Sequence, residues 1–342
     1  MGHSVVNRHP RVTNMINIVG GSGFIGTRLS RMLASANTPF KIVDKAPSHT
    51  FPESVSLADI RSPNELNRVL SDGGTLIHLA AEHRDDVQPK SRYDEVNVQG
   101  AKNLCEAARN KGIQKIVFVS TVAVYGFAPL GTNESGMINP FNDYGRTKAE
   151  AELVFEAWQA EASAQRTLII VRPTVVFGEQ NRGNVYNLLK QIASGRFVMI
   201  GDGKNRKSMA YVENIAAFLI HSLSFSPGVH LFNYIDKPDF TMNSLVSHVR
   251  KIMGKSEEIG FRIPYGVGFF IGKFFDLGSR ITGKSFAISS IRVKKFCANS
   301  VYETSIEKTG FVPPVLLTDA LARTIKFEFM EDHQADKLFY SE

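Results

Sequence analysis

Tyr144 and Lys148 stand four residues apart in the segment Tyr-Gly-Arg-Thr-Lys. This spacing places both side chains on one face of a helix. A cation beside a phenol favours the phenolate, so Tyr144 could act as a base near neutral pH. The pattern alone recurs by chance in many helices, and its meaning depends on what else the chain contains.

A glycine-rich turn lies more than a hundred residues upstream, where Gly20, Gly23 and Gly26 follow an apolar run and open a predicted helix. In such turns the first glycine allows a tight bend, the second lets a pyrophosphate approach the backbone, and the third lets helix and sheet pack closely. The helix N-terminus adds N–H donors and a favourable dipole for an anion. We therefore predict a dinucleotide site that includes Gly20, Gly23, Phe24, Ile25 and Gly26.

Asp44 comes 18 residues after Gly26, at the end of a second predicted strand. A carboxylate at this place suits hydrogen bonds from the adenosine ribose and selects NAD over NADP, although Lys45 could tolerate a 2′-phosphate. We expect Asp59 and Ile60 to flank the adenine; the alternative for Asp59 is a helix cap or a surface carboxylate. Together with Tyr144 and Lys148, the site predicts an enzyme that moves a proton and a hydride at a carbon bearing a hydroxyl.

Strand-like and helical segments alternate along the first half of the chain. Strands are predicted at 15–19, 40–43, 75–79, 115–119 and 167–171, and helices at 24–35, 93–110 and 144–162. This alternation predicts an α/β fold with a doubly wound parallel sheet. Ligands bind beyond the carboxyl ends of such strands, where we find Asp44, Asp59, Leu79-Ala80-Ala81, Thr121 and Pro173.

The predicted organisation has a large domain and a smaller C-terminal lobe. Residues 1–14 are polar and predicted to be a disordered leader, and 15–176 form the NAD-binding domain, to which 205–225 return. Residues 177–204 and 226–330 supply mainly the substrate-binding lobe, and 331–342 form a tail. In the lobe, Asn184 should cap a helix at 185–193 that Gly195 ends, and Gly201-Asp-Gly203 marks a turn.

The bulk composition limits the class of protein. The chain has 342 residues, of which 43% are hydrophobic, enough for a full core. Its 2 cysteines have no metal-ligand spacing and fit a reducing compartment, so we expect a cytoplasmic protein with no metal site. The net charge of +7 fits either an anionic partner or ordinary surface lysine, and no nucleic-acid-binding module is recognisable.

The ordered set of motifs resembles the extended short-chain dehydrogenase/reductase family, in its nucleotide-sugar epimerase/dehydratase branch. The resemblance covers nearly the whole chain after Asn14 and rests on the glycine turn, Asp44, Asp59, His78-Leu-Ala-Ala81, Asn97-Val-Gln-Gly100, Ser120-Thr-Val-Ala-Val-Tyr-Gly126, Tyr144/Lys148, Arg172-Pro173 and Tyr211-Val-Glu-Asn214. It implies a Rossmann fold, NAD as cofactor, further cofactor contacts at Asn97, Ser120 and Pro173, and a homodimer through the helices at 93–110 and 144–162.

Three segments look like a narrower group, the bacterial enzymes that epimerise N-acetylglucosamine at C4 on undecaprenyl diphosphate and supply O-antigen units. These segments are Ala81-Glu-His-Arg-Asp-Asp-Val87, Asn181-Arg-Gly-Asn-Val-Tyr-Asn-Leu-Leu-Lys-Gln191 and Lys207-Ser-Met-Ala-Tyr-Val212. A close relative could act on the UDP-sugar instead. UDP-sugar epimerases usually carry an arginine and an acidic residue where this chain has Lys207-Ser208, and an Arg-x-Gly-Asp-like motif where it has Arg292-Val-Lys-Lys295. These departures put a uridine-reading site in doubt but leave a site for a glycosyl diphosphate.

The resemblance implies a mechanism in which Thr121 and Tyr144 bond the sugar 4-hydroxyl while Lys148 bonds the nicotinamide ribose. Tyr144 takes the O4 proton as C4 passes hydride to NAD, and the 4-keto sugar turns and accepts the hydride on its other face. Candidate substrate residues are Glu82, His83, Thr121, Asn181, Arg182, Asn184 and Lys207, although a solvated loop explains the first two and helix capping explains Asn184 equally well. Dehydratases of this family usually carry an acidic pair beside the catalytic Ser/Thr. In this chain Val122-Ala123 follow Thr121, so the acid that dehydration needs is missing. A reductase or a dinucleotide-sensing protein are the remaining alternatives.

Segment 264–284 combines apolar residues at helical spacing with basic residues on another face. The apolar residues are Val267, Phe270, Ile271, Phe274, Leu277 and Ile281, and the charged ones are Lys273, Asp276, Arg280 and Lys284. Such a helix could lie on an anionic bilayer at the cytoplasmic face of the inner membrane. It could equally face the core of the substrate lobe, and periodicity does not separate the two.

Overall fold

The computed structural model describes residues 14–84, 87–282, 289–333 and 337–340, and a seven-stranded parallel sheet forms its larger part. The strands follow the order β10-β6-β5-β4-β1-β2-β3. Their bounds are β1 (Ile16–Val19), β2 (Phe40–Asp44), β3 (Val55–Leu57), β4 (Thr75–His78), β5 (Lys115–Val119), β6 (Thr167–Pro173) and β10 (Gly228–Tyr234). The predicted doubly wound α/β sheet is confirmed.

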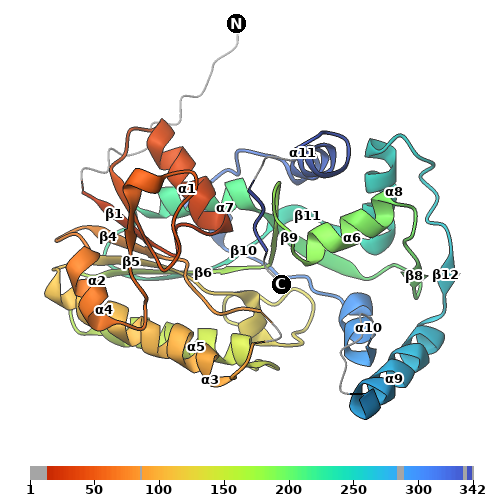
Figure 1. Cartoon of the computed structure of the whole chain (residues 1–342), viewed down its shortest axis with the longest axis horizontal. Coiled ribbons are helices and arrows are strands. Elements are labelled where there is room, and N and C mark those ends of the chain that lie inside the picture. Colours follow the sequence, from red (N-terminus) through yellow and green to blue (C-terminus); the bar gives the residue numbers. More distant parts are fainter. Residues whose placement is uncertain (1–13, 85–86, 283–288, 334–336, 341–342) are drawn as a thin grey trace, which may run out of the picture.

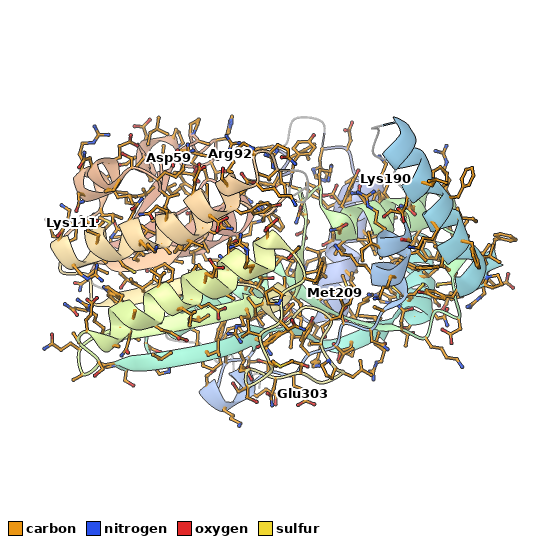
Figure 2. The ribbon with its side chains drawn as sticks, turned by 90° about the horizontal axis from the view of Figure 1, so that it is seen from below. Asp59, Arg92, Lys111, Lys190, Met209 and Glu303 are labelled. Carbon is orange, nitrogen blue, oxygen red and sulfur yellow. The ribbon has the colours of Figure 1, made fainter. Side chains whose placement is uncertain are left out.

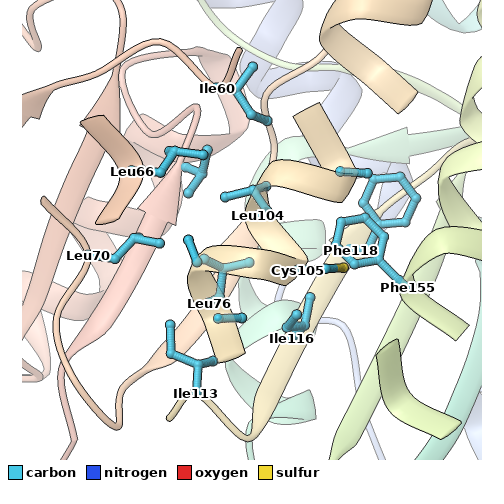
Figure 3. Close-up of a cluster of buried hydrophobic side chains, with 14 of the residues drawn as sticks. Ile60, Leu66, Leu70, Leu76, Leu104, Cys105, Ile113, Ile116, Phe118 and Phe155 are labelled. Atoms are coloured by element: carbon cyan, nitrogen blue, oxygen red, sulfur yellow. The ribbon is translucent and has the colours of Figure 1, made fainter. Parts of the chain in front are cut away.

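Helices cover both faces of this sheet (Figure 1). One face carries α1 (Phe24–Ser35) and α7 (Val212–Ser222), and the other carries α2 (Pro63–Val69), α4 (Gly100–Asn110) and α5 (Asp143–Ala160). Figure 3 shows the core under α2, α4 and α5, where the Phe155 ring lies 4.7 Å from that of Phe118 in the sheet. Because the sheet is buried on both sides, its strands are nearly continuous apolar runs.

The predicted helix at 93–110 contains an irregularity that the sequence did not reveal. It begins as α3 (Ser91–Tyr93), continues as a π-helical segment, η2 (Asp94–Gln99), and ends as α4. A π-helical turn inserts an extra residue and is frequent at functional sites. Asn97 lies in this segment and is buried.

A second, smaller lobe lies beside the sheet (Figure 1). Its strands are β7 (Val175–Phe177), β9 (Arg206–Tyr211) and β11 (Asp236–Thr241) in one sheet, and β8 (Met199–Ile200) with β12 (Arg262–Ile263) in another. Its helices are α6 (Asn184–Ala193), α8 (Met242–Ile252), α9 (Tyr265–Thr282), α10 (Ser290–Cys297) and α11 (Leu317–Phe329). Short turns of 3₁₀-helix elsewhere in the chain are η1 (Pro52–Ser54), η3 (Val122–Tyr125) and η4 (Ile306–Thr309). The N-cap of α6 is Gly183, so Asn184 is the first helical residue and not the cap.

The boundary between the two lobes is crossed more often than the sequence indicated. Of the range 205–225 that was expected to return to the large domain, α7 joins the core formed by α1 and the sheet, whereas β9 pairs with β7 and β11 of the smaller lobe. However, β10 falls in the range assigned mainly to the substrate lobe, and it pairs with β6 over its whole length, from Gly228 opposite Thr167 to Tyr234 opposite Pro173. The sheet is therefore completed by a strand that follows a visit to the other lobe.

Helix α9 packs closely on its neighbours through glycines on one side. A Cβ at Gly272 would lie 2.7 Å from Ser290 Cα of α10, and one at Gly268 would lie 2.7 Å from Ile200 Cγ2 of β8. The glycine at position 272 thus lets α9 approach α10, and the one at position 268 lets it approach β8. Phe270 and Phe274 face outward and are 76% and 75% exposed. Nothing is described for the side chains of Arg280 and Ile281, and Lys284 lies outside the described residues.

The C-terminal segment folds back onto the large domain. The Phe339 N–H donates to Gln180 O at 2.9 Å, the Arg182 N–H donates to Phe339 O at 2.7 Å, and the Phe339 ring lies 5.7 Å from that of Phe24. The described part of the predicted tail, 331–333 and 337–340, is thus anchored beside α1, while the predicted leader lies outside the described residues except for Asn14. No helix within the described ranges is long and apolar enough to cross a membrane.

Candidate active site

A cavity of about 780 Å³ opens at the carboxyl ends of the parallel strands and extends to the smaller lobe. Most of the residues predicted from the sequence line it: Gly20, Gly23, Phe24, Ile25, Gly26, Asp44, Asp59, Ile60, Leu79, Ala80, Ala81, His83, Ser120, Thr121, Tyr144, Lys148, Pro173, Asn181, Asn184 and Lys207. The cavity has the position that doubly wound sheets use for ligands. Figure 2 shows the molecule from the side on which Asp59 and Arg92, two lining residues, are visible.

The three glycines of the turn have different reasons to be glycine. Gly20 has φ +82°, and a Cβ there would lie 2.4 Å from Ala80 N; a Cβ at Gly26 would lie 2.5 Å from Gly21 Cα. At Gly23 the nearest atom to a Cβ would be Gly20 O, at 3.3 Å. Gly23 is the N-cap of α1, so no side chain caps the first N–H groups of this helix. The space and the donors at Gly23 fit a phosphate group.

Asp44 is fixed by two backbone donors at the end of β2. Its Oδ2 accepts from Ser22 N and its Oδ1 from Ala46 N, both at 3.0 Å. These bonds orient a carboxylate that lines the cavity one strand away from the glycine turn. Asp59 lines the same region, and its carboxylate bonds the Arg61 guanidinium, which holds the pKa of Asp59 below its usual value.

Replacing Asp44 by serine should weaken NAD binding by about 10- to 100-fold, because hydrogen bonds to a charged group are each worth ~1.5–3 kcal/mol. NADP binding should weaken less, since the 2′-phosphate no longer meets a carboxylate. Isothermal titration of the apo-protein with both cofactors measures the change. Asp319→Ser, at an exposed position of α11, is the control. An unchanged preference for NAD in the Asp44 variant would contradict the role of Asp44.

The predicted catalytic residues meet inside the cavity. Tyr144 opens α5 just after its N-cap, Asn142, whose side chain accepts from Gly145 N. Thr121 follows β5, and its Oγ1 accepts from Ala123 N at 3.1 Å. Burial raises the pKa of Tyr144 to about 12, and a hydrogen bond with Thr121 opposes this rise. Thr121 therefore favours the phenolate, as a partner of the base should.

Burial acts against the ionised form of both Tyr144 and Lys148, so the role of Tyr144 as a base near neutral pH, with Lys148 beside it, stays a prediction. Burial lowers the pKa of Lys148 to about 7. Its Nζ donates to Val119 O at 2.7 Å and lies 4.0 Å from the centroid of the Phe118 ring. A phenol with a pKa of about 12 needs further positive charge beside it before it can take a proton at neutral pH.

The low pKa of Lys148 predicts a pH dependence of stability. Between about 7, the pKa in the folded chain, and the ordinary 10.5, the unfolded chain binds the proton more tightly. The free energy of unfolding should therefore gain a contribution from this residue as the pH rises from 7 to 10. Lys148→Met should lose that gain, measured as the difference in Tm between pH 7 and pH 9 without cofactor. The exposed Lys190 (Figure 2) provides the control variant, Lys190→Met, which should keep the gain.

Three predicted site residues lie outside the cavity lining. Asn97 accepts from Glu82 N at 2.8 Å and donates to Glu82 O and Thr147 Oγ1, both at 2.9 Å. Its amide is thus occupied in holding the loop after β4 against α5, outside the cavity lining, and its predicted cofactor contact stays a prediction. Glu82 belongs to this loop and is buried, and its Oε1 lies 3.5 Å from Arg84 Nε.

Arg182, the third of these residues, forms an ion pair with the buried carboxylate of Glu328 and stacks 4.0 Å from the ring centroid of Tyr186. Lys207 lines the cavity, but its Nζ donates to Lys295 O at 2.9 Å and Ala298 O at 2.6 Å. Its pKa falls to about 8 because it is buried. Lys207 therefore holds the last turn of α10 in place, and its predicted contact with the substrate stays a prediction.

Several lining residues were not singled out as site residues in the sequence, among them Arg92, Phe127, Phe141 and Tyr302, and Lys295 was noted only for a departure from a related motif. Lys295 belongs to the Arg292–Lys295 segment, whose departure from the related pattern was visible. The two phenylalanines lie in the irregular connection between η3 and α5, where neither periodicity nor a motif marks a residue. In the structure both rings line the cavity and lie beside lysines of α10.

A buried polar network holds α5, which carries Tyr144 and Lys148, against the sheet. The Arg172 guanidinium of β6 donates through Nε to Glu152 Oε1 of α5 at 2.9 Å and through a terminal nitrogen to the Tyr125 hydroxyl at 2.7 Å. Ser120 donates to the same carboxylate, and the Tyr125 hydroxyl donates to Asn233 Oδ1 at 2.8 Å. Both side chains of the Arg172–Glu152 ion pair are buried. The network links four elements around the catalytic residues.

Comparison with known proteins agrees with this geometry. Residues 16–233 match the model of the NAD dependent epimerase/dehydratase family. The chain is 46% identical over 327 residues to the N-acetyl-alpha-D-glucosaminyl-diphospho-ditrans,octacis-undecaprenol 4-epimerase of Escherichia coli O157:H7, covering 95% of this chain and 98% of that one. It is 25% identical to UDP-glucose 4-epimerase of Vibrio cholerae, over 80% of this chain and 87% of the relative.

Among solved structures, UDP-glucose 4-epimerase of Thermotoga maritima with UDP-glucose aligns with a TM-score of 0.71 at 20% identity, covering 92% of this chain and 98% of that one. The UDP-glucose 4-epimerase of Thermus thermophilus in complex with NAD aligns with a TM-score of 0.70 at 20% identity, over 92% and 98% of the two chains. At this identity the structures establish the fold that the sequence predicted.

Proposed function

This chain belongs to the NAD dependent epimerase/dehydratase family, with NAD as its cofactor, and we propose that it epimerises C4 of N-acetylglucosamine linked to undecaprenyl diphosphate, giving N-acetylgalactosamine. The observation that carries the proposal is the cavity in which Thr121, Tyr144 and Lys148 meet beside the glycine turn. The substrate is proposed from the 46% identity to the Escherichia coli enzyme over nearly all of both chains. The product would serve surface-polysaccharide units such as O-antigen.

The residues of the chain divide the work of such a reaction. The backbone at Gly23 and the first turn of α1 would hold the pyrophosphate of NAD, and Asp44 the adenosine ribose. Bound NAD supplies the acceptor and donor of the hydride at C4. Thr121 orients the sugar 4-hydroxyl and stabilises the Tyr144 phenolate, and Tyr144 takes the O4 proton and returns it after the 4-keto sugar has turned.

The electrostatics support this division. Because burial raises the pKa of Tyr144 to about 12, the phenol stays protonated in the apo-protein. A cationic nicotinamide ring in the same cavity would favour the phenolate, since an opposite charge nearby stabilises the charged form. Base and hydride acceptor would then be ready in the same complex and only there.

The test uses two substrates that share the sugar. Purified protein is given UDP-N-acetylglucosamine or undecaprenyl-diphosphate-linked N-acetylglucosamine without added cofactor, and the C4 configuration of the product is assayed. We expect inversion of the lipid-linked sugar, with NAD carried through purification. Turnover confined to the UDP-sugar would overturn the proposed substrate and leave a nucleotide-sugar 4-epimerase, the alternative that the Vibrio cholerae relative represents.

The proposal includes peripheral contact with a membrane through α9. Phe270, Phe274 and Leu277 of this helix are exposed by 76%, 75% and 56%, and Lys273 lies among them. Figure 2 shows α9 at the edge of the molecule with side chains directed away from the body. An amphipathic helix with such a surface binds at the boundary of an anionic bilayer.

Flotation with vesicles of anionic lipid tests this contact. The protein should float at low salt, and Phe270→Ser/Phe274→Ser should stay at the bottom of the gradient. Leu316→Ser, a change of a 69% exposed leucine before α11, should not alter flotation. Absence of the wild-type protein from the lipid fraction at low salt would contradict membrane contact.

A homodimer through α4 and α5 completes the proposal. Leu153 lies on α5 and is 64% exposed, although it is a large apolar residue in the middle of the helix. Packing of α4 and α5 against the same helices of a second copy would cover it in a four-helix bundle. Light scattering should give the mass of a dimer, and Leu153→Glu should give a monomer; a monomeric wild-type protein would exclude the arrangement.

A further inference from the structure

Two phenylalanine rings stand at the border of the cavity without an apolar cover. Phe127 and Phe141 both line the cavity and are 48% and 45% exposed. They stack on each other with ring centroids 4.9 Å apart and ring planes inclined by 28°. Exposed apolar side chains that are grouped, and not scattered singly, mark places where something else binds.

Two lysines of α10 lie beside these rings; Lys295 is among the residues that line the cavity, whereas Lys294 lies outside the lining. Lys294 Nζ lies 4.9 Å from the centroid of the Phe127 ring, and Lys295 Nζ lies 4.9 Å from that of Phe141. The turn that carries them is fixed, because Lys207 donates to the carbonyls of Lys295 and Ala298. Each ring therefore has an ammonium group over its face, in the arrangement that cations and aromatic rings favour.

We propose that Phe127, Phe141, Lys294 and Lys295 form an exit gate for the lipid-linked diphosphate, through which the substrate leaves the cavity toward the lipid. The inference rests on the proposed function, because it assigns the substrate's non-sugar parts to this side of the same cavity. The two ammonium groups add positive charge for the diphosphate at this border, next to the buried ammonium of Lys207. The two rings take the first isoprene units.

The position of the gate fits a substrate that is held at both ends. The reacting carbon must lie at Tyr144 and Thr121, inside the cavity, so the diphosphate at the other end of the sugar is directed toward the border. An isoprenoid chain beyond it needs apolar surface, which the rings supply. Helix α10 packs against α9, as Figure 1 shows, and α9 carries the exposed rings of Phe270 and Phe274.

A uridine group would use the gate differently. A uracil ring could stack on a phenylalanine, but the polar edge of the base requires hydrogen-bond partners in fixed positions. Phenylalanine supplies none, and a lysine ammonium supplies donors only. The composition of the gate thus favours an apolar chain behind the diphosphate.

The test measures KM and kcat of variants on two substrates, N-acetylglucosamine linked to undecaprenyl diphosphate in detergent micelles and the same sugar linked to methyl diphosphate. In Phe127→Ser/Phe141→Ser, KM for the undecaprenyl substrate should rise at least about tenfold more than KM for the methyl substrate, because burial of aromatic area is lost only with the lipid. In Lys294→Gln/Lys295→Gln, KM should rise for both substrates, since both carry the diphosphate. Leu316→Ser, which lies outside the cavity lining, should resemble the wild-type protein.

Retention of NAD and an unchanged Tm establish that each variant is folded. The gate is overturned if the phenylalanine variant keeps the wild-type ratio of KM values for the two substrates, or if the lysine variant loses affinity for neither. The proposed function fails separately, if the wild-type protein turns over no polyprenyl-linked sugar while it inverts UDP-N-acetylglucosamine. In that case the substrate assignment of the gate falls with it.

Discussion

Tyr144→Phe is expected to lose nearly all turnover while it still binds NAD. The substitution removes only the hydroxyl that hydrogen-bonds with Thr121 and that takes the O4 proton. Loss of a positioned acid–base group costs ~10²–10⁴ in rate, and here the same oxygen also returns the proton at the end of the cycle. The decrease should appear in kcat, because the ring and its packing in the cavity remain.

Rates are measured on the lipid-linked sugar under saturating conditions, and bound NAD is quantified after denaturation of the protein. Tyr186→Phe is the matched control, since Tyr186 stacks on Phe329 and lies outside the cavity lining. If Tyr144→Phe keeps a substantial fraction of wild-type turnover, another group must be the base and the assignment of Tyr144 is wrong.

Arg172→Met should destabilise the protein by about 3–5 kcal/mol, because it leaves the buried carboxylate of Glu152 without its partner. The side chains of Arg172 and Glu152 are only 6% and 5% exposed, so water cannot take the place of the guanidinium. The Tyr125 hydroxyl also loses a donor at 2.7 Å. Urea unfolding of the apo-protein measures the loss as a lower midpoint with little change in slope.

The double variant Glu152→Gln/Arg172→Met separates charge from packing. Removing both charges should restore part of the lost free energy of unfolding, since no buried carboxylate remains unpaired. A double variant at least as unstable as Arg172→Met would contradict this explanation. Because Glu152 lies on α5 one turn after Lys148, turnover of the single variant should also fall through the displaced helix.

The elements that hold the cofactor could be read from the sequence because each depends on local signals. Helix α1 was predicted with the bounds that the structure has, Phe24–Ser35, since a glycine turn begins it and an apolar stripe continues through it. Asp44 and Thr121 were placed at strand ends by the same logic. Strand ends in a parallel sheet meet at one edge, so these residues reach one cavity even though they are far apart in the chain.

The roles that depend on distant partners could not be predicted. Arg182 was expected to meet a diphosphate but pairs with Glu328, and Lys207 is occupied by carbonyl groups of α10. Periodicity and motifs contain no record of such contacts. The pKa of Tyr144 depends on the whole fold in the same way: the nearby lysine is visible in the sequence, whereas the burial that raises this pKa is not.

The late arrival of β10 has a consequence for how the chain is made. On the ribosome, β6 is complete at Pro173, but the strand that covers its open edge ends only at Tyr234, about 60 residues later. At synthesis rates of ~5–20 residues per second, the edge waits for roughly 3–12 s. During this interval an all-apolar strand, Leu168 to Val171, presents unpaired backbone groups to other nascent chains. When ribosomes are spaced further apart on the messenger RNA, exposed strands of neighbouring nascent chains meet less often. Such spacing during expression should therefore raise the soluble yield of this protein.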